Sequence, residues 1–185
     1  MQSGERVRRE RALRGAVLAG DEQAWRTWYD ESFAGLDAYV RWRCAGLRDL
    51  ADDVVQETWL TAVRRIRAFD PAAGSFAAWL RGVAAHLLRN HFRREARRGR
   101  RARPLPPDAG PATPAADAGR DRAERVARAL AALPEHYEAA LRAKYLDGRC
   151  VADFAAETGQ TPKAVESLLT RARQAFRDAY AAEED

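Results

Sequence analysis

Apolar residues recur every three or four positions through most of the chain, which is the spacing of one face of an α-helix. In the first half, this pattern predicts helices at about 21–44, at 50–66 and from residue 75 onward. Asp21 and Ser75 are residue types that cap helix N-termini, and Pro71 breaks the chain between the second helix and the third. The buried stripe of the third helix is predicted to consist of Phe76, Leu80, Val83 and Leu87.

The second half shows the same spacing in shorter segments. One helix is predicted to end before Pro134, another to end at Gly148, and a third to span about residues 151–157. The last helix begins with Thr161 as its cap and Pro162 at its first position, and it is predicted to bury Val165, Leu169, Ala172 and Phe176. A short helix, a glycine-containing turn and a capped basic helix are typical of a helix-turn-helix unit, whose second helix enters the DNA major groove. A plain helical bundle with the same turn is the alternative.

Prolines mark the boundary between the two halves. Five of the eight prolines lie between residues 104 and 114, and proline removes a backbone donor and clashes with the preceding helical turn. Residues 103–120 are therefore predicted to form an extended linker between two separately cored domains. The sequence holds a single isoleucine, Ile66, and few other β-branched residues, so no extended sheet is expected. The predicted fold class is all-α, with two small helical domains.

Charge is concentrated next to this linker. The chain has 32 basic residues and a net charge of +5, and all but Lys144 and Lys163 of the basic residues are arginine. Residues 89–103 include eight arginines and one acid, Glu95. Such a patch is typical of a surface that binds a polyanion. A solvated arginine run is the alternative.

Other features limit where the chain acts. No stretch approaches the roughly 20 apolar residues of a membrane span, and the N-terminus lacks the apolar segment of a signal peptide. Cys44 and Cys150 match no metal-binding spacing and are interpreted as reduced thiols. We therefore expect a cytoplasmic protein without membrane insertion.

Three carboxylates lie within about one helical turn at Asp52, Asp53 and Glu57, and they raise the possibility of a metal-dependent nucleic-acid enzyme. No glycine-rich phosphate loop accompanies them, and His86 and His91 are five residues apart, which does not place them on one helical face. A solvated acidic face or a protein-docking face explains the carboxylates better. We expect no metal, no cofactor and no catalytic residue.

Several motifs occur in a particular order along the chain. Residues 49–59 read DLADDVVQETW, followed by a segment from Phe69 through Trp79 and by the pair Arg93 and Arg94. After the prolines come LPE at 133–135, YLDG at 145–148, AVES at 164–167 and RAR at 171–173. The first group resembles region 2 of bacterial RNA polymerase sigma factors and the second resembles region 4. The resemblance covers about residues 15–180 and is closest to the extracytoplasmic-function group, which keeps only these two domains.

The resemblance implies an alternative sigma factor that binds core RNA polymerase, at the β′ coiled coil and the β subunit, and directs promoter recognition, promoter opening and transcription initiation. Polymerase performs the chemistry, so the chain itself would not be an enzyme. The expected parts are a basic N-terminal extension at 1–14, a region 2 domain at 15–99, a flexible proline-rich linker at 100–121 and a region 4 helix-turn-helix domain at 122–182. Promoter DNA is the second expected partner, and an anti-sigma factor is a third that the family often uses.

The resemblance also assigns residues to each partner. Asp53, Gln56 and Glu57 match the polar contacts to the β′ coiled coil. The minus-ten element, with one base flipped from the stack, is expected to contact Phe69, Ser75, Phe76, Trp79, His86, Arg89, Asn90, Arg93 and Arg94. The minus-thirty-five element is expected to contact Thr161, Lys163, Glu166, Ser167, Thr170, Arg171 and Arg173.

The sequence departs from the family pattern at a few of these positions. Relatives commonly carry Arg, Asn and Asp at the positions of Gly82, His86 and Asn90, and basic residues at those of Glu166 and Leu168. The competing hypothesis is a stand-alone helix-turn-helix regulator whose first domain senses a ligand or dimerises. Such a repressor would bind its promoter duplex tightly without core polymerase.

Overall fold

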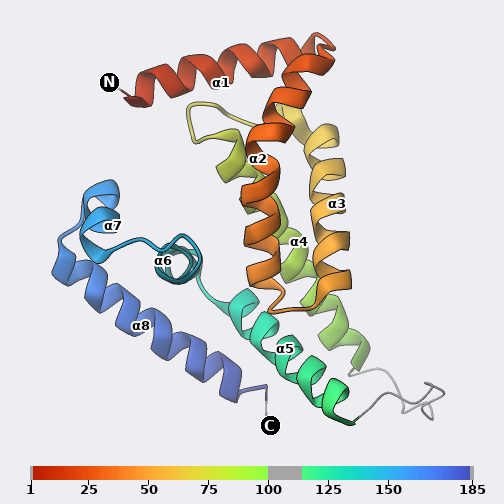
Figure 1. The fold of residues 1–185 in the computed structure, drawn as a ribbon, viewed down its shortest axis with the longest axis vertical. Coiled ribbons are helices and arrows are strands. Elements are labelled where there is room, and N and C mark those ends of the chain that lie inside the picture. The colour runs from red at the N-terminus through yellow and green to blue at the C-terminus, as the bar shows by residue number, and fades with distance from the viewer. Residues whose placement is uncertain (1, 100–113, 184–185) are drawn as a thin grey trace. The chain divides into compact units, whose positions relative to one another are not determined.

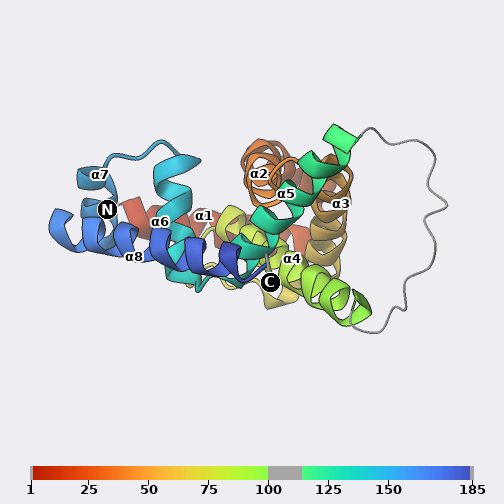
Figure 2. The same cartoon turned by 90° about the horizontal axis from the view of Figure 1, so that it is seen from below.

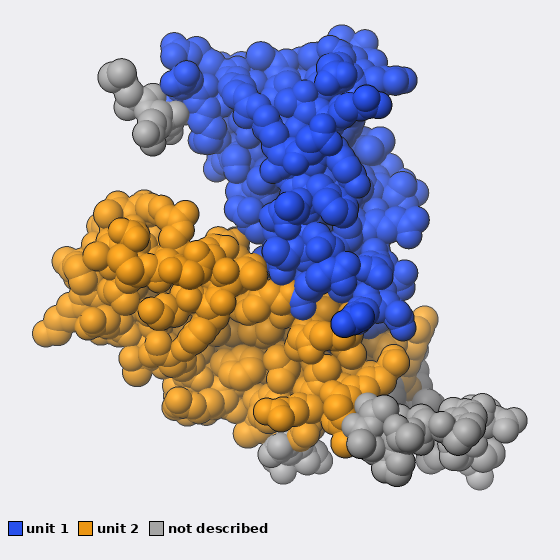
Figure 3. All heavy atoms as spheres, in the orientation of Figure 1, with its two compact units in different colours: residues 1–41, 48–93 blue, residues 42–47, 94–185 orange. Residues whose placement is uncertain are grey.

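The structure is a computed structural model that describes residues 2–99 and 114–183, all of whose regular elements are helical (Figure 1). The elements are α1 (Gln2–Leu18), α2 (Glu22–Arg43), α3 (Arg48–Arg65), η1 (Ile66–Ala68), α4 (Phe76–Gly99), α5 (Pro114–Ala132), α6 (Glu135–Tyr145), α7 (Val151–Thr158) and α8 (Pro162–Ala181). Two compact units are distinguished: unit 1 holds residues 1–41 and 48–93, and unit 2 holds residues 42–47 and 94–185 (Figure 3). The all-helical prediction is confirmed.

Aromatic rings form the centre of unit 1, where α2, α3 and α4 run alongside one another and α1 crosses one end of them (Figure 1). The rings of Trp28 and Phe76 stack with centroids 4.1 Å apart. Phe69 meets both of them edge-on. Burial of rings of this size contributes several kilocalories per mole, so this cluster fixes where α4 begins.

The predicted helix starts of unit 1 are confirmed by their hydrogen bonds. Asp21 Oδ1 accepts from the backbone N–H of Gln23 at 2.8 Å and of Ala24 at 3.2 Å. Ser75 Oγ accepts from the backbone N–H of Ala78 at 3.2 Å. These side chains satisfy backbone donors that have no partner within the helix.

The buried stripe of α4 differs from the prediction. Phe76 and Leu80 are buried as expected, but Val83 and Leu87 are only half-buried. The stripe continues instead through Ala84 and Leu88, which have no exposed surface. This stripe advances strictly by four residues, so Ala84 takes the buried position that the predicted pattern gave to the larger Val83.

The N-terminal segment is also a structured element. Helix α1 covers residues 2–18, where a basic extension at 1–14 was expected. Val17 and Glu10 are its buried residues among those described. Since α1 has no continuous apolar stripe, its helical character could not be recognised from hydrophobic spacing.

Unit 2 is organised around α8, which contacts α5, α6 and α7 (Figure 2). Val165, Leu169 and Ala172 of α8 are buried, as predicted, while Phe176 is half-buried. The segment 42–47 also belongs to this unit, and its Arg43 Nη1 lies 2.7 Å from Glu138 Oε2 on α6.

The helix-turn-helix geometry of unit 2 is confirmed. Gly159 ends α7 in the left-handed conformation, with φ of 66°, where glycine carries no Cβ penalty. Thr161 Oγ1 accepts from the backbone N–H of Ala164 at 3.2 Å, and Pro162 follows it at the start of α8. The preceding helix, α7, is capped by Cys150, whose Sγ accepts from the backbone N–H of Asp153.

The linker prediction needs a correction at its C-terminal end. Residues 114–120 are helical, because α5 begins at Pro114 and not near residue 122. Proline is tolerated in the first helical turn, where its missing N–H would have no partner, and alanines follow it. The remaining part of the predicted linker, residues 100–113, lies outside the described residues.

Candidate functional site

The predicted docking residues share one exposed face of α3. Asp53, Gln56 and Glu57 are all exposed. Among the described residues, no hydrogen bond or ion pair is found for the Asp53 or Gln56 side chain, while Glu57 Oε1 lies 3.6 Å from Arg64 Nη1. A carboxylate and an amide on this face are therefore available to a partner.

An exposed apolar groove of about 440 Å³ adjoins this face. It lies between α2 and α3 and is lined by Tyr29, Phe33, Asp37, Arg41, Asp52, Val55, Gln56, Trp59, Leu60 and Val63. Leu60 and Val63 are 43% and 56% exposed. The ring of Tyr29 stacks on that of Phe33, with centroids 5.1 Å apart. Such a contiguous apolar surface, with Gln56 at its edge, is typical of a protein-docking site.

Tyr29 and Phe33 follow the apolar spacing of α2, yet they are 44% and 37% exposed. Leu60 and Val63 could have been noticed, because they lie off the buried stripe that runs through Val55 and Ala62. Large apolar residues outside a buried stripe are the sequence signal for this groove.

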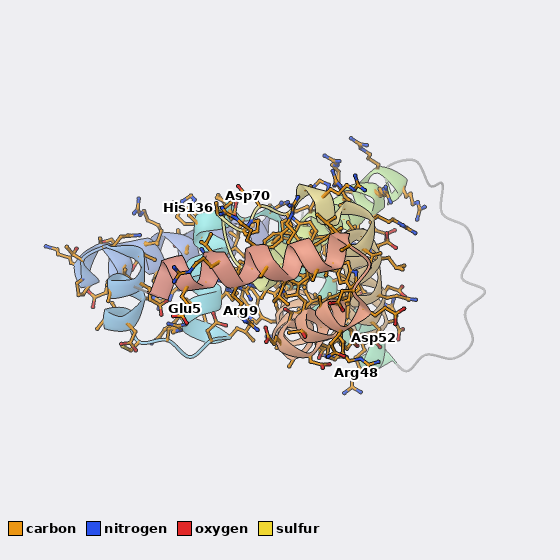
Figure 4. The ribbon with its side chains drawn as sticks, turned by 90° about the horizontal axis from the view of Figure 1, so that it is seen from above. Glu5, Arg9, Arg48, Asp52, Asp70 and His136 are labelled. Atoms are coloured by element: carbon orange, nitrogen blue, oxygen red, sulfur yellow. The ribbon has the colours of Figure 1, made fainter. Side chains whose placement is uncertain are left out.

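Ion pairs border the apolar groove. Arg41 donates from Nε to Asp37 and from Nη2 to Asp52, each at 2.9 Å. The hydrogen bond to Asp37, followed by its charge, raises the pKa of Arg41 above the ordinary value. Figure 4 labels Asp52 near the start of α3. Asp52 is thus paired with a cation, and no group of three metal-ligating side chains is found in the part of the chain that the structure describes.

A second groove, of about 600 Å³, lies between α3 and α4. We call it the polar groove, and it is lined by Thr61, Arg64, Arg65, Trp79, Gly82, Val83, His86, Leu87 and Asn90. Trp79, His86 and Asn90 were predicted for the minus-ten element, and the structure brings them together here. Arg64 and Arg65 were not predicted, although two adjacent arginines in the last turn of a helix are a signal for an anion. An aromatic ring beside exposed guanidinium groups suits a single nucleic-acid strand, whose bases stack and whose phosphates are negative.

Phe69 and Phe76 require a correction. They are 2% and 1% exposed and form part of the aromatic core, so their rings are not available to a flipped base. Ser75 uses its hydroxyl oxygen to cap α4. These three residues shape the start of α4 and do not line the polar groove.

Of the predicted arginines of α4, Arg89 lies next to the groove-lining Asn90, and Arg93 and Arg94 follow further along the helix. Arg89, Arg93 and Arg94 are exposed. Arg93 Nη2 donates to Oδ1 of Asn90 at 3.0 Å, which orients the Asn90 amide. These exposed arginines can contact phosphates without any change in the backbone of α4.

The outward face of α8 carries most of the residues predicted for the minus-thirty-five element. Lys163, Glu166, Ser167, Thr170 and Arg171 are exposed at three- and four-residue intervals. Leu168 is buried, so the apolar residue at this position does not face DNA.

Arg173 and Thr161, which were also predicted for this element, make contacts within unit 2. Arg173 Nε donates to the hydroxyl of Tyr145 at 2.9 Å, and its guanidinium carbon lies 6.0 Å from the centre of that ring. Thr161 is engaged as the cap of α8. Arg173 is therefore held beside Tyr145 at the end of α6.

The comparisons with known proteins match both halves of the chain. Residues 35–98 match the model of sigma-70 region 2, and residues 123–176 match that of sigma-70 region 4. The ECF RNA polymerase sigma factor SigF of Caulobacter vibrioides is 34% identical over 164 residues, which is 89% of this chain and 88% of SigF. The ECF RNA polymerase sigma factor BldN of Streptomyces coelicolor is 35% identical over 75 residues, which cover 40% of this chain and 28% of BldN.

Two solved structures were also matched. One is the sigma factor RpoE in complex with the anti-sigma factor NepR from Bartonella quintana, with 18% identity, a TM-score of 0.47, and coverage of 84% of this chain and 95% of that one. The other is the RsbN–BldN complex, with 22% identity, a TM-score of 0.38, and coverage of 89% and 97%. No helix among the described residues is long and apolar enough to cross a membrane.

Proposed function

The chain belongs to the extracytoplasmic-function (ECF) RNA polymerase sigma factors, and from this premise we propose which of its surfaces hold the polymerase and the promoter. As an ECF sigma factor with regions 2 and 4, it directs RNA polymerase to promoters and starts transcription, and it is a non-enzymatic subunit of that polymerase. The observation that carries this conclusion is the 34% identity to SigF across 89% of the chain. The hypothesis of a stand-alone repressor has no comparable support.

We propose that core polymerase docks on α3 and on the apolar groove beside it. Asp53, Gln56 and Glu57 supply polar contacts to the β′ coiled coil, and Leu60 and Val63 supply apolar area that binding would remove from water. An apolar centre with a polar edge is the usual composition of a specific protein interface. The β subunit is the further polymerase partner.

We propose that the non-template strand of the minus-ten element enters the polar groove. Trp79 offers a ring on which an unstacked base can stack, and His86 with Asn90 offers hydrogen-bonding groups for its edge. Arg64 and Arg65 on α3, with Arg89 on α4, would neutralise the phosphates. This assignment replaces Phe69 and Phe76, which are buried.

The minus-thirty-five element is proposed to lie along the outward face of α8. Lys163, Glu166, Ser167 and Thr170 are near enough to the helix start to meet base edges, while Arg171 lies further along and contacts phosphate. Glu166 can accept a hydrogen bond from a cytosine amino group.

Run-off transcription with purified core polymerase on a genomic promoter library tests the function. Transcripts that depend on the added sigma factor are expected, and their start sites would give the promoter sequence. Tight binding to duplex promoters without core polymerase, together with no added transcripts, would contradict it. We further propose that the protein acts in the cytoplasm with the polymerase, and that an anti-sigma factor competes for the apolar groove.

A further inference from the structure

A buried carboxylate joins α1 to the start of α4. Glu10 is 6% exposed. Its Oε1 accepts from the backbone N–H of Phe76 at 3.0 Å, and its Oε2 accepts from the indole N–H of Trp28 at 2.9 Å. Hydrogen bonds to an ionised acceptor are stronger than neutral ones. One side chain of α1 therefore fixes both the first residue of α4 and the tryptophan that stacks on it.

The same side of α1 holds the segment that precedes α4. Arg14 Nη2 donates to the backbone carbonyl of Arg67 at 2.9 Å, and Arg6 Nη1 donates to that of Pro71 at 3.4 Å. Arg6, Glu10 and Arg14 are spaced by four residues, so they share one face of the helix. Their contacts reach the beginning, the middle and the end of residues 67–76.

The segment 66–75 is anchored in the core by the buried side chains of Ile66 and Phe69, but few hydrogen bonds hold the rest of its backbone. Besides the Ser75 cap and the bonds from α1, the hydrogen bonds found for it among the described residues are short-range, from the Phe69 N–H to the carbonyl of Ile66 and from the Ala72 and Ala73 N–H groups to Asp70. Loop backbone with few hydrogen bonds opens more readily than helical backbone. Beyond the packing of Ile66 and Phe69, the three side chains of α1 support the backbone of this segment.

We propose that α1 is a brace for promoter opening, and that Glu10 is a positioning residue which holds the start of α4 so that the polar groove is ready to receive an unpaired base. Glu10 is buried, so it acts on the DNA only through α4. The inference rests on the proposed function, because Trp79, on the first turn of α4, lines the proposed binding groove. A preorganised site binds more tightly because little ordering remains to be done on binding.

Hydrogen exchange in the free protein tests the brace directly. Glu10→Gln keeps the shape but replaces one acceptor oxygen by an amide group that faces a donor. We expect peptides covering residues 66–76 to exchange about tenfold faster, the loss expected for roughly one charged hydrogen bond. Peptides of α8 should not change. The matched control is Glu5→Gln, an exposed acid on the same helix (Figure 4), which should leave both sets of peptides unchanged.

Promoter opening in the holoenzyme tests the consequence, with full-length protein and a promoter recovered by run-off transcription. Glu10→Gln should bind core polymerase with unchanged affinity but lower permanganate-detected opening about tenfold, at a temperature well below the unfolding of the variant. A role limited to overall stability would leave opening unchanged under that condition. If Glu10→Gln does not fold, Arg14→Met serves instead, because it removes only one partly exposed hydrogen bond and keeps the side-chain stem.

The outcomes separate the two proposals. The brace is overturned if Glu10→Gln leaves the exchange of residues 66–76 unchanged. It is also overturned if Glu10→Gln leaves promoter opening unchanged while Arg65→Ala, in the polar groove, lowers opening. In both cases the proposed function stands. Unchanged opening in both Glu10→Gln and Arg65→Ala overturns the assignment of the polar groove as well. Faster exchange with reduced opening and normal polymerase affinity supports the brace.

Discussion

Replacing Asp53 and Gln56 together by alanine should weaken binding to core polymerase without unfolding the chain. Both side chains are exposed, and within the described residues neither forms a hydrogen bond or ion pair. Exposed substitutions of this kind change the free energy of unfolding by no more than about 0.5 kcal/mol. The effect on binding is larger because the partner loses one contact to a charged group and one to a neutral group.

The size of that effect follows from typical hydrogen-bond energies. A bond to a charged group contributes about 1.5–3 kcal/mol and a neutral one about 1 kcal/mol, so a loss of roughly 2.5–4 kcal/mol is expected. At about 1.4 kcal/mol per factor of ten, the dissociation constant should rise roughly 60- to 700-fold. The contribution of Asp53 to the binding free energy should decrease as the salt concentration is raised, because salt screens exposed charges.

Fluorescence anisotropy of labelled full-length protein, titrated with core polymerase at several salt concentrations, measures the change. The matched control replaces Glu22 and Gln23, an exposed acid and amide at the start of α2, by alanine. That control should bind within about twofold of the unsubstituted chain, since each 1.4 kcal/mol corresponds to tenfold. Equal losses in both pairs, or an unchanged affinity for the α3 pair, would refute the docking face.

Substitutions at four further positions test the cap of α8 and the promoter-binding surfaces. Thr161→Ala should lower the free energy of unfolding by about 1 kcal/mol in urea titrations, because the α8 cap is lost, and Thr161→Ser should restore it. Glu166→Lys should raise affinity for many duplexes and reduce discrimination among minus-thirty-five sequences, whereas Arg171→Ala should weaken all of them about equally and flatten the salt dependence by about one phosphate contact. If Glu166→Lys left discrimination unchanged and Arg171→Ala changed which sequence is preferred, the roles given to these two residues would be contradicted. His86→Asn should change which minus-ten base supports the most transcription, and an unchanged base preference would remove His86 from the polar groove's readout.

Helix ends and turns could be predicted because their chemistry is local. Asp21, Ser75 and Thr161 cap the helices at which the sequence placed them. Gly159 has the positive φ that a helix-ending glycine supplies. Each of these depends on residues within a few positions, so spacing along the chain carries enough information.

The burial of particular side chains could not be predicted in the same way. Helix α1 has too little hydrophobic periodicity to indicate a packed helix, and its buried Glu10 is satisfied by Trp28 and Phe76, which are 18 and 66 residues away. Phe69 and Phe76 carry the aromatic rings expected of a base-stacking site, yet both rings are buried in the core. Whether an aromatic residue packs inside or faces a ligand depends on tertiary contacts that spacing does not record.

Helix α3 connects the two proposed surfaces of unit 1, since one of its faces lines the apolar groove with Leu60 and Val63 and another lines the polar groove with Arg64 and Arg65. Its buried stripe between them includes Thr58 and Ala62, both without exposed surface. Because one helix lines both grooves, it fixes the position of the proposed polymerase contacts relative to the proposed strand-binding residues. Polymerase docking would therefore hold the polar groove at a defined place on the enzyme without any rearrangement of unit 1.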